Sequence, residues 1–92
     1  KLSDFAVQRI LKEVDTKTLA MALKAANDEL KEKVLRNVSE RVAEMLKDEM
    51  EYLGPVRVRD VENAQKRIVE VVRELEQAGE IDLTTEEEEI IE

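Results

Sequence analysis

Residues 61–79 have the sequence VENAQKRIVEVVRELEQAG, the stretch with the clearest periodicity in the chain. Its apolar residues are separated alternately by three and four positions, which places them along one face of an α-helix. They are Val61, Ala64, Ile68, Val71, Leu75 and Ala78. Gly79 follows where helices commonly end, because glycine accepts the left-handed conformation. The pattern predicts a long helix that lies across the rest of the molecule and supplies part of a shared core.

Four short polar side chains upstream predict the starts of four shorter helices. Ser3, Asp15, Asn27 and Ser39 each precede an amphipathic segment, and such side chains accept hydrogen bonds from the free amides of a first helical turn. We expect helices from Ser3 to about Val14, from Asp15 or Thr16 to about Ala25, after Asn27, and over Glu40–Leu53. A Gly-Pro pair at residues 54–55 ends the fourth.

Each short helix has an apolar side that predicts its buried face. The residues expected to face inward are Phe5, Ile10, Leu11 and Val14, then Leu19, Ala22, Leu23 and Ala26, then Leu30, Val34 and Val38, and finally Val42, Leu46, Met50 and Leu53. With connections of only one or two residues, each helix must turn sharply onto its neighbour. We therefore predict an all-α fold, a compact armadillo-like bundle of about five helices closed by the long C-terminal helix.

The composition restricts the chemistry that this chain can perform. Its 92 residues include no Cys and no His, which excludes disulfides, thiolate sites and the commonest general base. The adjacent acids Asp28–Glu29 and Asp48–Glu49 point about 100° apart on a helix, so neither pair converges on one site. No apolar run approaches the roughly 20 residues of a membrane span. We expect no enzyme activity, no cofactor or metal site, and no membrane insertion.

The acidic charge is concentrated at one end of the chain. The formal net charge is −8, yet residues 1–79 hold sixteen acids and fifteen bases. From Glu80 onward there are seven acids and no base. We expect a folded helical domain over residues 1–81 and an acidic, mobile tail over residues 82–92. Neither part has the basic face of a nucleic-acid-binding protein.

Several charges in the fourth helix and the following loop have no evident structural purpose. Arg41, Glu44 and Asp48 share a face, with the base near the helix start and the acids near its end, opposite to the preference of the helix dipole. This pattern fits either a solvated face or a partner-binding face. Arg57 has no acid in its own loop, so it either pairs back to Asp48 or Glu49 or faces a partner.

Three segments together resemble a known family over about residues 5–81. They are KEVDTKTLAMALK at 12–24, ELKEKVLRNVSERVAEMLKDEM at 29–50, and GPVRVRDVENAQ at 54–65, before a helix ending in LEQAGEI. This combination resembles the C-terminal domain of the bacterial flagellar motor switch protein FliG. The resemblance implies a rotor component that receives torque from the stator and takes part in switching the direction of rotation.

The resemblance also implies particular residues and partners. The positions matching the family's stator-interacting charges are Lys24, Arg41, Asp48, Glu49 and Arg57. The implied partners are the cytoplasmic loop of a MotA-type stator subunit and, in the full-length protein, FliM and neighbouring FliG subunits. The implied location is cytoplasmic, at the inner face of the cell membrane in the flagellar basal body. Without His, the chain cannot contain the family's Glu-His-Pro-Gln motif for FliM, so we expect it to represent only the C-terminal part.

Two other readings remain open at this point. Magnesium-transporter N-terminal domains have a similar helical repeat, so the chain could be a regulatory helical domain of a transporter. The stripe over residues 61–78 could also be a coiled-coil seam, which would bury Ile68 and Leu75 between two chains.

Overall fold

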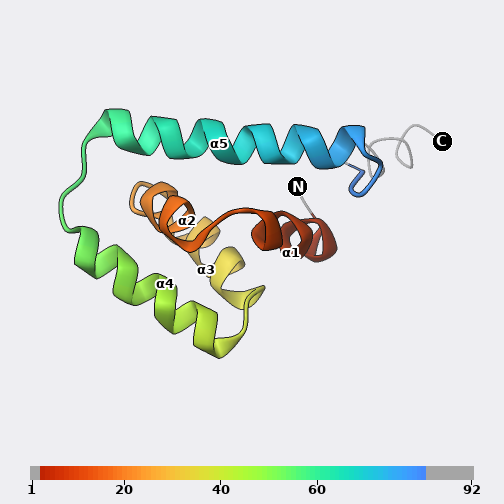
Figure 1. Cartoon of the computed structure of the whole chain (residues 1–92). Helices are drawn as coiled ribbons and strands as arrows, with labels where there is room; N and C mark the ends of the chain where they lie inside the picture. Colours follow the sequence, from red (N-terminus) through yellow and green to blue (C-terminus); the bar gives the residue numbers. More distant parts are fainter. Residues whose placement is uncertain (1–2, 83–92) are drawn as a thin grey trace.

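A computed structural model describes residues 3–82, and these form five helices with no strand among them (Figure 1). The helices are α1 (Asp4–Glu13), α2 (Thr16–Leu23), α3 (Asp28–Arg36), α4 (Glu40–Leu53) and α5 (Val58–Gln77). The predicted all-α bundle is confirmed, and the predicted bounds of α4 agree with the structure. The predicted tail lies almost entirely outside the described residues. No helix within residues 3–82 combines the length and the apolar character that crossing a membrane requires.

The first four helices begin at the four predicted capping residues. The side chains of Ser3, Asp15, Asn27 and Ser39 accept hydrogen bonds from the amides of Ala6, Thr18, Leu30 and Val42, at 3.1, 3.3, 2.8 and 3.1 Å. The fifth helix differs. Arg57 occupies its N-cap position without a side-chain cap, and Asp60 lies in its first turn.

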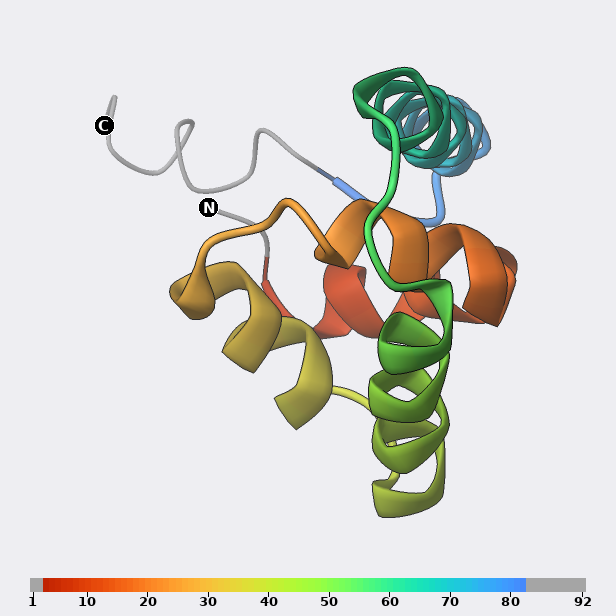
Figure 2. The same cartoon turned by 90° about the vertical axis from the view of Figure 1, so that its left-hand side faces the viewer.

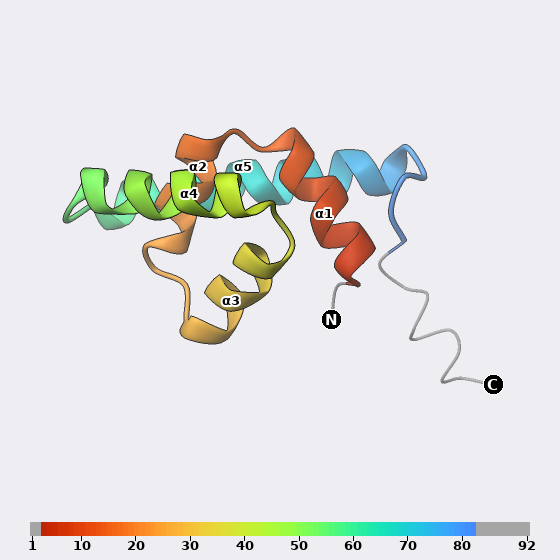
Figure 3. The same ribbon diagram turned by 90° about the horizontal axis from the view of Figure 1, so that it is seen from below.

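The short helix α2 lies at the centre of the molecule. It contacts α4 on one side and α5 on the other, while α1 packs along α5. Figure 2 shows α5 end-on above α1 and α2, and Figure 3 shows α4 crossing in front of α2 with α5 behind. The most completely buried residues are Ala20, Leu46 and Val71, one from each of α2, α4 and α5. The core therefore forms where these three helices meet.

The apolar stripe of α5 packs against the core of its own chain. Val61, Ala64, Val71 and Leu75 are buried, and Ile68 is partly buried against the same core. Gly79 has a φ of +77°. The amide of Glu80 donates to the carbonyl of Leu75 at 2.9 Å, which closes the helix in a Schellman-type turn. This turn returns the chain to the bundle, where Ile81 is buried.

Three details of the predicted packing are wrong. Phe5 is 68% exposed because it lies about 140° around the helix from Ile10, away from the face that α1 buries. Leu30 is exposed because the first turn of α3 lies at the edge of the bundle. The connections contain two to four residues instead of one or two, since α2 ends at Leu23 and leaves a longer link to α3.

Candidate functional site

The five predicted contact residues lie at the C-terminal end of α2, on α4, and in the loop before α5. Lys24 is the C-cap residue of α2, Arg41 lies in the first turn of α4, Asp48 and Glu49 lie in its second half, and Arg57 precedes α5. Arg41, Asp48 and Arg57 are exposed, whereas Lys24 and Glu49 are half-buried. All five lie along α4 or at the adjoining ends of α2 and α5.

Gly54 determines how Arg57 is presented. Its φ of +60° and ψ of −152° define a conformation in which a side chain would be strained. Its amide donates to the carbonyl of Glu51 at 3.2 Å and closes the last turn of α4. The chain then turns away, and Arg57 sits in extended backbone immediately before α5. The Gly-Pro break therefore holds Arg57 outside both helices.

None of the five residues has a salt bridge or a side-chain hydrogen bond to any residue in 3–82. The same is true of all seven charged residues of α4 within the described chain. The possibility that Arg57 pairs back to Asp48 or Glu49 is therefore wrong. The charges of this region remain available to another molecule.

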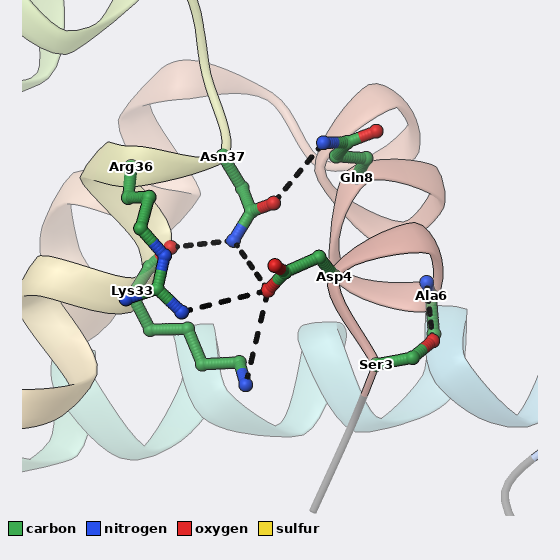
Figure 4. Close-up of polar contacts among 7 residues, drawn as sticks. All are labelled: Ser3, Asp4, Ala6, Gln8, Lys33, Arg36 and Asn37. Atoms are coloured by element: carbon green, nitrogen blue, oxygen red, sulfur yellow. Dashed lines mark hydrogen bonds and ion pairs between the residues drawn. The ribbon is translucent and has the colours of Figure 1, made fainter.

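Between α1 and α3, by contrast, charged and polar side chains hold helices together (Figure 4). The Asn37 amide nitrogen donates to the Asp4 carboxylate at 3.2 Å, and Arg36 and Lys33 lie 3.6 and 4.0 Å from the same oxygen. The hydrogen bond from Asn37, followed by the positive charges of Arg36 and Lys33, lowers the pKa of Asp4. The Asn37 oxygen also accepts from Gln8 at 3.1 Å. These contacts join α1 to α3.

A second cluster joins α1 to the end of the described chain. The Arg9 guanidinium donates to Glu80 at 2.6 Å and to Glu13 at 2.8 Å. These two hydrogen bonds, to Glu13 and then to Glu80, raise the pKa of Arg9. The paired charges of residues 3–82 thus lie on α1, α3, α5 and the turn after α5, and none lies on α2 or α4.

Two shallow hollows lie beside α4, and Asp48 lines both. One is lined by Lys24, Lys31, Lys47, Asp48, Met50 and Glu51. The other is lined by Asp15, Thr16, Lys17, Met45, Asp48, Glu49 and Tyr52. The structure therefore brings Lys24, Asp48 and Glu49 together around one segment of α4. Arg41 and Arg57 line neither hollow and lie toward opposite ends of this surface.

The hollows also contain residues that the sequence interpretation missed. Lys31 and Lys47 lie beside Lys24, and Met45 and Tyr52 lie beside Asp48. For Met45 and Tyr52 a sequence pattern was present, because they follow Arg41 at four and eleven positions on the same helical face. Lys31 lies on a different helix, α3, and only the tertiary arrangement brings it to this hollow.

One further groove has a different character. It encloses about 300 Å³ between α1, α2, α3 and α5, and Gln65 is the single polar residue among its lining residues. A groove without titratable groups offers no acid, base or nucleophile. Residues 3–82 also contain no cluster of His, Cys, Asp or Glu suited to a metal ion.

Comparison with known proteins identifies the family. A family profile described as the FliG C-terminal domain matches residues 1–83. The flagellar motor switch protein FliG of Thermotoga maritima is 59% identical over 81 residues, which are 88% of this chain and 24% of that protein. The chain belongs to the FliG C-terminal domain family. FliG of Helicobacter pylori is 47% identical over 92 residues, which are all of this chain and 26% of that protein.

Solved FliG structures share this fold. The crystal structure of residues 86–343 of Helicobacter pylori FliG aligns with a TM-score of 0.85 at 44% identity, covering 88% of this chain and 38% of that one. The structure of full-length FliG from Aquifex aeolicus gives a TM-score of 0.82 at 41% identity, covering 88% of this chain and 25% of that one. This chain thus spans about a quarter of the FliG proteins that it matches. The transporter and coiled-coil readings gain no support.

Proposed function

We propose that this chain is the torque-receiving part of the rotor of the bacterial flagellar motor, acting as the C-terminal domain of a FliG-type switch protein. It contacts the cytoplasmic loop of a MotA-type stator subunit through Lys24, Arg41, Asp48, Glu49 and Arg57. One observation carries the proposal: these five charges have no partner within residues 3–82, whereas the α1–α3 corner has its charges paired.

The mechanism is electrostatic and mechanical, and no covalent step is needed. An exposed ion pair contributes only about 0.2–1 kcal/mol in water. A contact of this strength forms and breaks readily, which suits repeated stator steps. Charge complementarity between two surfaces mainly increases the rate of encounter and sets the register.

The order of the charges gives the surface a direction. Arg41 and Asp48 are seven residues apart, which corresponds to about 10 Å along the helix axis. A stator loop with complementary charges meets a positive site first and a negative site second, or the reverse. Turning the whole domain over would present the two signs in the opposite order, and this is how the domain takes part in switching direction.

The other proposed partners belong to the longer protein that contains this domain. They are FliM and neighbouring FliG subunits, which we expect to be bound by the full-length protein. The proposed location is the cytoplasmic side of the membrane at the flagellar basal body.

Charge reversal in the full-length protein tests the stator contact. Cells carrying Arg41→Asp together with Asp48→Lys are expected to build flagella and lose most rotation, while circular dichroism of the domain stays unchanged. Charge reversals on the stator loop are expected to restore rotation. The matched control is Arg73→Glu with Glu76→Lys, two exposed charges of α5 that also lack partners within residues 3–82. Normal rotation of the Arg41/Asp48 variant with an intact fold would make this surface a solvated face.

A further inference from the structure

The outward face of α4 is an ordered stripe in which charged and apolar residues alternate. Arg41, Met45, Asp48 and Tyr52 follow one another at intervals of four, three and four residues. At 100° per residue these four positions fall within about 60° of one another around the helix. Met45 is 47% exposed and Tyr52 is 85% exposed. We call these four residues the α4 stripe.

The exposed apolar residues of the α4 stripe are not part of the core. Leu46 is completely buried on the inner face of α4, and Val42, Met50 and Leu53 pack against the core beside it. Met45 and Tyr52 contribute nothing to that cluster, and the Tyr52 hydroxyl has no hydrogen bond to residues 3–82. An exposed tyrosine offers a large apolar area and one polar group at a small entropic cost, which makes this residue type common in interface anchors.

A hollow beside the α4 stripe provides space for a side chain of a partner. Met45, Asp48, Glu49 and Tyr52 form its α4 wall, and residues 15–17 at the start of α2 form the other wall. The Asp15 carboxylate accepts hydrogen bonds from the Thr18 amide at 3.3 Å and the Thr18 hydroxyl at 2.7 Å. These bonds fix the wall formed by α2, so the hollow exists before a partner arrives.

We propose that the α4 stripe binds an amphipathic α-helix of the stator loop, with Met45 and Tyr52 as its apolar anchors. The partner helix carries a carboxylate opposite Arg41 and a cationic side chain opposite Asp48, about two turns apart. Apolar side chains at three- and four-residue spacing lie between them and pack on Met45 and in the hollow beside Tyr52. This inference rests on the proposed stator contact and identifies the chemistry of the segment that makes it.

Charge complementarity and spacing together select this partner. Side chains at three- and four-residue spacing on a second helix form ridges that can pack between those of the stripe. A purely acidic segment would meet Asp48 and Glu49 unfavourably, whereas a helix with one charge of each sign satisfies both ends of the stripe. The apolar anchors then supply contact energy, and the charges set the register and direction.

The test removes the apolar anchors and leaves the charges in place. In cells carrying the full-length protein, Met45→Gln with Tyr52→Asn is expected to reduce the stators engaged per motor and the torque by about five- to tenfold, the range for loss of interface anchors. Met45→Leu with Tyr52→Phe is expected to retain both. The matched control is Phe5→Asn, an exposed aromatic residue on α1. Thermal unfolding of each variant domain checks that the fold is unchanged.

Site-specific photo-crosslinking from positions 45 and 52 identifies the partner segment. Crosslinks to stator positions three, four or seven residues apart support a helix, and crosslinks at two-residue spacing would overturn it. One outcome would be wild-type torque in the Met45→Gln, Tyr52→Asn variant and lost rotation in the Arg41→Asp, Asp48→Lys variant. This outcome would overturn the role of Met45 and Tyr52 as anchors and would still support the stator contact. Normal rotation in both double variants would overturn this inference and the proposed function together.

Discussion

The α1–α3 corner and the outer surface of α4 are both rich in charge, and they use it differently. At the corner, Asp4 is held by Asn37, Arg36 and Lys33 from a helix distant in the sequence. On α4, neither Arg41 nor Asp48 contacts a partner within residues 3–82. The difference teaches that charge density alone does not mark a binding surface. Pairing instead separates the charges that hold helices together from those that folding leaves unpaired, and only the second group is available to a partner.

The largest expected difference in stability is between variants of two neighbouring residues of α4. Leu46 is completely buried, so Leu46→Ala should lower the free energy of unfolding by about 2–5 kcal/mol. Met45→Ala should change it by less than about 0.5 kcal/mol, since Met45 faces outward and packs on no core residue. Urea unfolding of the 92-residue domain measures both. Similar losses in the two variants would mean that the outer face of α4 also stabilises the fold.

The next largest difference in stability is expected between a variant of the α1–α3 corner and a variant of α4. Asn37 links α1 to α3 and donates to the Lys33 carbonyl at 2.8 Å, so Asn37→Ala should cost about 1 kcal/mol. The matched change Asp48→Ala removes a polar side chain without a partner in the described chain and should leave the free energy of unfolding nearly unchanged. Equal unfolding midpoints for the two variants would contradict the distinction between the regions.

A smaller effect is expected in the pH dependence of stability. The pKa of Asp4 is lowered in the folded domain, first by the hydrogen bond from Asn37 and then by Arg36 and Lys33. The unfolded chain therefore binds a proton more readily, and the stabilisation from Asp4 is present above about pH 4 and lost as pH falls through the lowered pKa. Asp4→Asn should flatten the decline in thermal midpoint below about pH 4. Parallel curves for wild type and variant would show that Asp4 contributes nothing.

The smallest effect is expected from neutralising the unpaired charges together. Lys24→Gln, Arg41→Gln, Asp48→Asn and Arg57→Gln in one domain should shift the thermal midpoint by no more than about 2–3 °C, since no ion pair within residues 3–82 is lost. Differential scanning calorimetry checks this, with Arg36→Gln plus Asn37→Ala as the comparison variant. A larger shift would assign these charges a structural role.

The sequence predicted the candidate site only in part. Arg41 and Asp48 were recognisable because a helix of known phase shows which charges share its outer face, whereas Lys24 and Glu49 were implied only by the family resemblance. Whether Arg57 pairs back to Asp48 or Glu49 could be decided only from the path of the chain after Gly54. The exposure of Met45 and Tyr52 needed the position of α2 against α4, because a side chain is buried or exposed only relative to its neighbours in space.

The sequence by itself determined the five helices, the caps of the first four, and the start and end of α4. These features depend on contacts within about four residues, such as the Ser39 hydroxyl accepting from the Val42 amide. Only the tertiary structure decided which charged side chains find a partner within the folded chain. The Asn37–Asp4 and Arg9–Glu80 contacts join residues that are 33 and 71 positions apart in the sequence. Local hydrogen bonds depend on chain geometry that a sequence reveals, whereas long-range pairing depends on how the helices pack against α2.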